Sequence, residues 1–146
     1  MTKFSVILYL FSLLTIQAET KKILFLGDSL TAGFGISKDK AFPALIQKKI
    51  DAKKLDYSII NAGLSGETTA GGARRIKWLL KQKVDILFVC LGGNDGLRGI
   101  QSKSSKGNLL KIISIAQKKG ITVVLGGMLA APNMGPDYAK EFKQIY

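Results

Sequence analysis

Strand-like and helix-like segments alternate along most of the chain, and this alternation limits the fold more than any other feature. Short apolar, β-branched runs are predicted to be strands, and longer segments with apolar residues three and four apart are predicted to be helices. The predicted strands cover residues 21–26, 56–63, 84–93 and 121–127, and the predicted helices cover 41–54, 67–83, 104–120 and 135–146. This order predicts an α/β sandwich in which helices cover both faces of a parallel sheet.

Capping residues predict where some of these helices begin and end. Thr68 or Thr69 is expected to cap the start of helix 67–83, and Gly120 is expected to end helix 104–120. Pro136 is placed where a first helical turn tolerates proline. In helix 41–54 the inward face is predicted to carry Phe42, Leu45, Ile46 and Ile50.

The N-terminus has the pattern of an export signal. A short start with Lys3 precedes an apolar run over residues 4–16, and Ala18 precedes the charged Glu19. This run is short for a bilayer span and typical of a signal-peptide core. We therefore expect residues 1–18 to be a signal peptide and residues 19–146 to be an exported domain, periplasmic or secreted. An N-terminal membrane anchor is the alternative.

The composition is basic, poor in cysteine and free of histidine. The net charge is +12, with one cysteine and no histidine. These counts argue against a transition-metal cluster, and we expect no metal and no cofactor. The lysines are scattered in pairs and form no stripe with arginines and aromatic residues, so no nucleic-acid partner is expected. The lysines are expected to lie on solvated faces, with weak contact with an anionic membrane surface.

Three successive predicted strands are each followed by a residue that offers a hydrogen-bonding group. Ser29 comes after the first strand, Gly66 after the second and Asn94 after the third. In parallel α/β sheets, ligands bind at the carboxyl ends of the strands, where these residues should meet. A serine hydroxyl can attack an acyl carbon, while a glycine N–H and an asparagine amide can stabilise the oxyanion that forms. The pattern therefore favours acyl-transfer chemistry at this edge.

Three sequence blocks carry a resemblance to a known family. The segments "FLGDSLTAG", "NAGLSGETT" and "LGGNDGLRG" resemble, in order and spacing, the first three blocks of the GDSL, or SGNH, hydrolases. The exported arylesterases and lysophospholipase-like thioesterases are the subgroup that the chain resembles most. The resemblance implies a three-layer α/β/α, flavodoxin-like fold and metal-free serine hydrolysis of esters or thioesters, including lysophospholipids. It implies Ser29 as nucleophile, with the Ser29 backbone, Gly66 and Asn94 as oxyanion donors.

The last block of that family, an Asp-x-x-His after a fifth strand, has no match in the sequence. By this comparison domain 19–146 is expected to be C-terminally truncated, without the last strand, the last helix and the catalytic Asp and His. Asp28 is expected to make local turn hydrogen bonds. Arg98 is expected to form a surface ion pair, or else to line the substrate entrance.

The missing block keeps two alternatives open. One is a non-catalytic relative in the cell envelope that binds an acyl ligand or a glycan. The other is a basic envelope-surface or nucleic-acid-binding protein.

Overall fold

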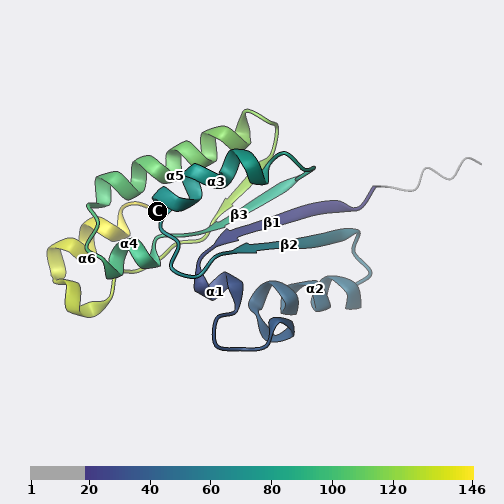
Figure 1. Cartoon of the computed structure of the whole chain (residues 1–146), viewed down its shortest axis with the longest axis horizontal. Helices are drawn as coiled ribbons and strands as arrows, with labels where there is room; N and C mark the ends of the chain where they lie inside the picture. The colour runs from purple at the N-terminus through teal and green to yellow at the C-terminus, as the bar shows by residue number, and fades with distance from the viewer. Residues whose placement is uncertain (1–18) are drawn as a thin grey trace, which may run out of the picture.

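The computed structural model describes residues 19–146, in which a four-stranded parallel sheet lies between two layers of helices (Figure 1). The predicted signal peptide, residues 1–18, lies outside the described residues. The strands are β1 (Lys21–Gly27), β2 (Tyr57–Gly63), β3 (Ile86–Cys90) and β4 (Thr122–Leu125). The longer helices are α2 (Phe42–Ala52), α3 (Thr69–Leu79), α5 (Ser102–Gln117) and α6 (Pro136–Lys143), and the shorter ones are α1 (Ser29–Ala32), α4 (Gly93–Leu97), η1 (Lys38–Lys40) and η2 (Pro132–Met134).

The strand order is β2-β1-β3-β4, and all neighbouring strands are parallel. Because the chain moves from β1 to β2 on one side and then crosses to β3 on the other, the order reverses at β1. Ligand sites of open α/β sheets lie at such reversals. In the register, Gly27 at the end of β1 lies between Gly63 of β2 and Cys90 of β3. The ends of these three strands therefore meet at one edge.

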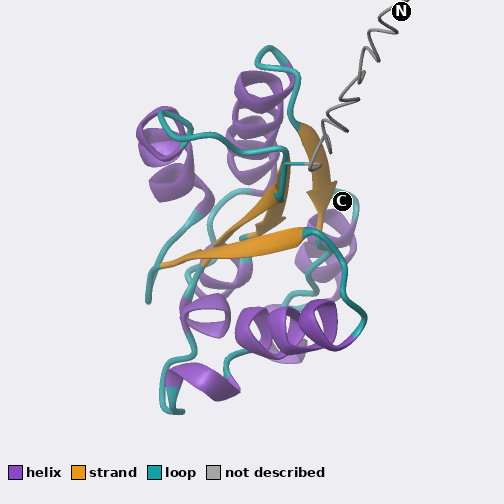
Figure 2. Cartoon of the chain, turned by 90° about the vertical axis from the view of Figure 1, so that its right-hand side faces the viewer, coloured by secondary structure: helices purple, strands orange, loops and turns teal. Residues whose placement is uncertain are grey.

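The alternation of side chains along β1 divides the core between the two layers. Leu24 and Leu26 are fully buried in the larger cluster, which α3, α5 and α6 cover. Phe25 takes part in a smaller aromatic cluster, with ring centroids 5.6 Å from Phe42 of α2 and 4.9 Å from Phe88 of β3. Figure 2 shows the helices on both sides of the strands. The predicted three-layer α/β/α arrangement is confirmed.

The predicted helix ends are also found. The hydroxyl of Thr68 accepts a hydrogen bond from the N–H of Gly71, which makes Thr68 the cap of α3. Gly120 has φ +73, and the N–H groups of Gly120 and Ile121 return to carbonyls in the last turn of α5, so that this glycine closes the helix. No helix within residues 19–146 combines the length and apolar character needed to cross a membrane.

One predicted inward position of α2 is wrong. Leu45 is 44% exposed, whereas Pro43 and Ile50 are buried. Two turns of helix separate Pro43 from Ile50, so these residues define the inward face, and Leu45 lies to one side of it.

The outer edge of β2 is closed by a side chain of α2. The carboxamide of Gln47 donates to the carbonyl of Tyr57 at 3.2 Å and accepts from the N–H of Ile59 at 2.7 Å. The side chain thus makes the two hydrogen bonds that the N–H and C=O of one residue in a neighbouring parallel strand would make.

Candidate active site

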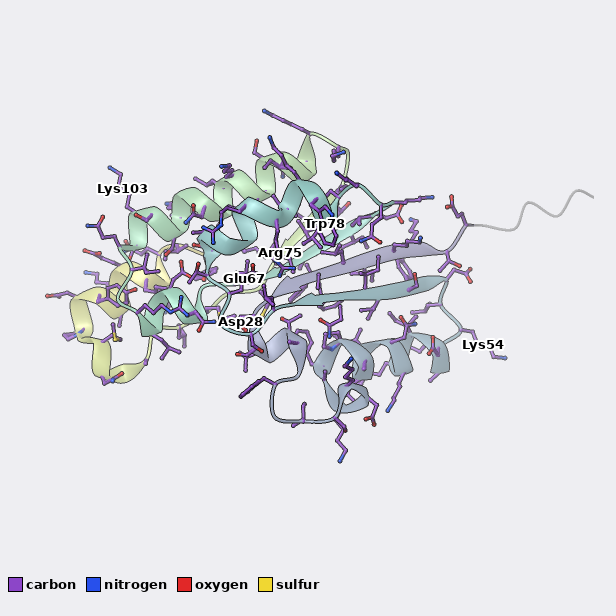
Figure 3. The ribbon with its side chains drawn as sticks, viewed as in Figure 1. Asp28, Lys54, Glu67, Arg75, Trp78 and Lys103 are labelled. Atoms are coloured by element: carbon purple, nitrogen blue, oxygen red, sulfur yellow. The ribbon has the colours of Figure 1, made fainter. Side chains whose placement is uncertain are left out.

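The segments that hold Ser29, Gly66 and Asn94 are joined by the side chain of Asn94. Its Nδ2 donates to the backbone carbonyl of Glu67 at 3.0 Å and to Oδ2 of Asp28 at 3.4 Å. Glu67 follows Gly66, and Asp28 precedes Ser29, so one carboxamide links the ends of β1, β2 and β3. Figure 3 shows Asp28 and Glu67 close together at this edge. The structure therefore brings the three predicted residues to one place.

Ser29 is the first residue of α1 and is half-buried. The preceding residue, Asp28, is only 3% exposed, and its Oδ1 accepts from the N–H of Leu30 at 3.0 Å. The predicted turn hydrogen bond of Asp28 is confirmed. Because the same carboxylate also contacts Asn94, Asp28 fixes the turn that presents Ser29.

Two glycines let this turn approach the sheet closely. A Cβ atom on Gly27 would overlap with the side chain of Thr31, and one on Gly63 would overlap with the backbone of α1 at Ala32. Side chains at either position would therefore push α1, and Ser29 with it, away from the strand ends.

Gly66 is exposed and adopts φ +78, a conformation that favours glycine. Its carbonyl accepts a hydrogen bond of 3.1 Å from Nη2 of Arg98. The expected surface ion pair of Arg98 is wrong, because no salt bridge involves it within the part of the chain that the structure describes. The guanidinium instead ties the loop after β3 to the Gly66 loop.

Asp95 organises a buried polar network that the sequence did not reveal. This carboxylate is fully buried and accepts from the N–H and the hydroxyl of Thr69, at 2.9 and 2.5 Å, and from the hydroxyl of Ser105 at 2.9 Å. Asn108 in turn donates to the Thr69 hydroxyl at 3.1 Å. The network fixes the start of α3 against α4 and α5, directly beside Asn94.

A second missed pair lies under the same edge. The guanidinium of Arg75 forms a salt bridge with Glu67, whose side chain is 3% exposed, and donates to the carbonyl of Ala62 at 2.6 Å (Figure 3). Arg75 thus anchors α3 to the end of β2 and holds the loop that carries Gly66. A usable sequence signal was the position of Glu67 immediately before a helix whose second turn carries an arginine.

Cys90, at the end of β3, also belongs to this edge. Burial, together with the negative charge of Asp28, raises the pKa of the Cys90 thiol. The thiol is therefore neutral at physiological pH. Among residues 19–146 there is no group of three acidic or cysteine side chains placed to hold a metal ion.

Comparison with known proteins agrees with this geometry. The model of the GDSL-like Lipase/Acylhydrolase family matches residues 25–145. The chain belongs to this family. The match includes all three strand ends described above, and the family's activity, acyl hydrolysis, is the activity suggested by the serine, glycine and asparagine at those ends.

Similar members of the GDSL-like family include esterases and a thioesterase. The chain is 38% identical over 135 residues to esterase TesA of Pseudomonas aeruginosa, covering 92% of this chain and 67% of that protein. It is 38% identical to thioesterase 1/protease 1/lysophospholipase L1 of Escherichia coli K12, covering 92% of this chain and 64% of that protein. The solved structure of AlinE4, an SGNH-hydrolase family esterase, matches with a TM-score of 0.85 at 41% identity, covering 89% of this chain and 70% of AlinE4. The chain thus spans about two thirds of the length of these relatives.

Proposed function

We propose that this chain provides the nucleophile and the oxyanion donors of a serine hydrolase that cleaves carboxylic esters or thioesters. The Ser29 hydroxyl attacks the acyl carbon, and the oxyanion accepts hydrogen bonds from the N–H groups of Ser29 and Gly66 and from Nδ2 of Asn94. The alcohol or thiol leaves, and water then releases the acyl group from Ser29. The observation that carries this proposal is the pair of Asn94 hydrogen bonds to the segments beside Ser29 and Gly66.

The backbone donors are available for this role. Within residues 19–146 the N–H groups of Ser29 and Gly66 donate to no other protein atom. Nδ2 of Asn94 carries two hydrogens, and its present partners are a carbonyl and a carboxylate. A substrate oxyanion at this place would compete for a donor that is already held in position.

The proton of Ser29 requires an acceptor. The 146 residues contain no histidine, and resemblance to the family implies that an Asp-x-x-His segment supplies this base. Removal of one member of a catalytic triad leaves the contribution of the oxyanion hole and of substrate binding, on the order of 10³-fold over water. We therefore propose that residues 1–146 alone hydrolyse esters slowly and that an imidazole accelerates them.

Exposed leucines favour an apolar acyl group. The connection after each of the four strands carries one exposed leucine: Leu30, Leu64, Leu97 and Leu129. Apolar side chains at the rim of a site select apolar substrates. The names of the relatives, which include esterase, thioesterase and lysophospholipase, support small esters, thioesters and lysophospholipids as substrates.

The proposed cellular setting is the periplasm or the medium. The apolar run over residues 4–16 and Ala18 before the charged Glu19 support removal of residues 1–18. Removal of residues 1–18 deletes only Lys3 from the charged residues, and the remaining net charge of +11 suits weak contact with an anionic membrane. Mass spectrometry of the protein recovered from periplasm and medium should find Glu19 at its N-terminus, and an intact Met1 would favour the membrane anchor.

Hydrolysis of p-nitrophenyl butyrate, with and without added imidazole, tests the catalytic proposal. The rate of the wild-type chain should exceed that of Ser29→Ala, and imidazole should widen this difference because it replaces the missing base. Ser65→Ala, in the exposed loop before Gly66, is the control and should behave as wild type. Equal rates for wild type and Ser29→Ala at every imidazole concentration would contradict the proposal. Saturable binding of a fatty acid without turnover would then favour the acyl-binding alternative.

A further inference from the structure

Helices α3 and α5 pack side by side over one face of the sheet (Figure 1). The charged residues within these two helices are all positive. The sequence has no acidic residue from Thr68 to Val84, and none from Gly96 to Pro136. Lys83, in the connection after α3, pairs with Glu19 and is set apart; the other exposed cations on these helices and the turns that follow them are Arg74, Lys77, Lys81, Lys103, Lys106, Lys111, Lys118 and Lys119. In the described part of the chain, no salt bridge involves any of them. This cationic set, with the two helices, is called the α3–α5 face.

Two large apolar side chains lie among these cations. Trp78 on α3 is 66% exposed, and Leu110 on α5 is 57% exposed. Arg74, four residues before Trp78 on α3, is its neighbour along the helix surface, and Lys81 follows three residues after it in the turn beyond the helix. Figure 3 labels Trp78 on α3 and Lys103 at the start of α5, in the same layer. The cations nearest to this exposed tryptophan suit an anionic partner.

The chemistry of this face favours a lipid surface over a nucleic acid. Indole rings prefer the headgroup level of a bilayer, and lysines nearby contact anionic phospholipids. Binders of single-stranded nucleic acid use a groove with several aromatic residues on which bases stack. This face has one aromatic residue on a pair of packed helices, and a cavity of about 700 Å³ lies in the opposite layer, over α2 and β2.

We propose that the α3–α5 face is the surface by which this protein docks on anionic phospholipid membranes. Trp78 and Leu110 enter the headgroup region while the lysines and Arg74 contact phosphate groups. The inference rests on the proposed membrane contact and gives that contact a place on the molecule. In this orientation the candidate active site, at the carboxyl ends of the strands, lies beside the membrane and stays open to the headgroup layer.

Trp78 provides a specific probe, because it is the only tryptophan of the chain. We would mix the full 146-residue chain with vesicles of phosphatidylcholine alone or with one quarter phosphatidylglycerol. The expected result is stronger co-sedimentation and a larger blue shift of Trp78 emission with phosphatidylglycerol than with phosphatidylcholine alone, and this difference should decline as salt is raised. Residues 1–18 are the same in every variant, so differences between variants report on the domain.

Charge reversal with a matched control locates the surface. Lys106→Glu/Lys111→Glu should weaken binding to phosphatidylglycerol vesicles by at least about tenfold. Lys49→Glu/Lys53→Glu, on α2 and at the residue that ends it in the opposite layer, changes net charge equally and should bind nearly as wild type. Circular dichroism would verify that both variants fold, and unchanged hydrolysis of p-nitrophenyl butyrate would separate this result from the catalytic proposal.

Three results would overturn the inference. Equal loss of binding in both variants would mean that contact depends on total charge, which leaves the weak membrane contact but removes the specific face. Sedimentation without a shift of Trp78 emission would place the contact elsewhere. Tighter binding to a DNA or RNA oligonucleotide than to vesicles at the same salt would assign the face to nucleic acid.

Discussion

The carbonyl oxygen of Gly66 accepts a hydrogen bond of 3.1 Å from Nη2 of Arg98, across the gap between the loops that follow β2 and β3. Gly66 has φ +78 and contributes its N–H to the proposed oxyanion hole. The guanidinium restrains the peptide that follows this N–H. Arg98 is thus a positioning residue for the Gly66 N–H, next to the Glu67 peptide that Asn94 contacts.

Arg98→Ala should therefore reduce catalysis more than stability. The rate that depends on Ser29 and is supported by imidazole should fall about tenfold, since misplacement of one oxyanion donor costs a fraction of its full contribution. The free energy of unfolding should change by less than about 0.5 kcal/mol, because the pair is exposed. Arg74→Ala, an exposed arginine with no such hydrogen bond, is the control. Equal rates for the two variants would show that the Gly66 peptide keeps its position without the hydrogen bond from Arg98.

Asp95→Ala should destabilise the fold by about 3 kcal/mol, as measured by urea unfolding. The substitution leaves the N–H of Thr69 and the hydroxyl of Ser105 buried without their acceptor. Asp137→Ala, at the exposed start of α6, is the matched acidic control and should stay within about 0.5 kcal/mol of wild type. A loss of similar size in both variants would mean that total charge is what matters.

Arg75→Met should cost about 3–5 kcal/mol of unfolding free energy, because it leaves the Glu67 carboxylate buried without its partner. Arg74→Met is the neighbouring control, on the exposed side of α3. The double variant Glu67→Gln/Arg75→Met should recover part of the loss, since no unpaired charge remains. If the double variant is no more stable than Arg75→Met, the destabilisation comes from loss of the hydrogen bond to the Ala62 carbonyl and not from the unpaired charge of Glu67.

Tyr146→Phe should reduce the decrease in the free energy of unfolding that occurs as the pH rises above neutral. Burial raises the pKa of the Tyr146 phenol well above its ordinary value, with a further contribution from the Asp95 charge, and the hydroxyl donates to the Leu91 carbonyl at 2.7 Å. A raised pKa in the folded state means that the contribution to stability is complete below about pH 10, where the unfolded phenol titrates, and declines above it.

The measurement is the free energy of unfolding of wild type and variant between pH 7 and 11. The variant should be about 1 kcal/mol less stable at pH 7 and should lose less than wild type between pH 9 and 11. Some slope should remain, because burial also raises the pKa of Cys90 and of Tyr138. Tyr57→Phe, at the start of β2, controls for loss of a phenol, and an alkaline slope as steep in Tyr146→Phe as in Tyr57→Phe would refute the assignment.

The strands and long helices could be predicted because their signals are local. The run of residues 84–93 contains β3, and Thr68 and Gly120 mark helix ends through contacts within a few residues. Helices α1 and α4 were missed because four or five residues are too few to show a helical period. The inward face of α2 was misplaced at Leu45 because periodicity alone does not orient a helix against the sheet.

The candidate site also contains residues that could be predicted from the sequence and residues that could not. Ser29, Gly66 and Asn94 could be proposed because each follows a predicted strand, and parallel strands end at a common edge. The roles of Asp95 and Arg98 could not, because their partners, Thr69 and Gly66, lie 26 and 32 residues away in sequence and become neighbours only in the folded chain.

The Gln47 carboxamide, which bonds to the outer edge of β2, makes the two edges of the sheet unequal in their ability to pair with another strand. An incoming strand on that side would have to displace hydrogen bonds that the protein already makes to Tyr57 and Ile59. On the other side β4 is the outermost strand among residues 19–146, and Val124 is 44% exposed there. For residues 19–146 on their own, amyloid-like or domain-swapped growth should therefore start more readily at β4 than at β2, and Gln47→Ala should make β2 a second site of growth.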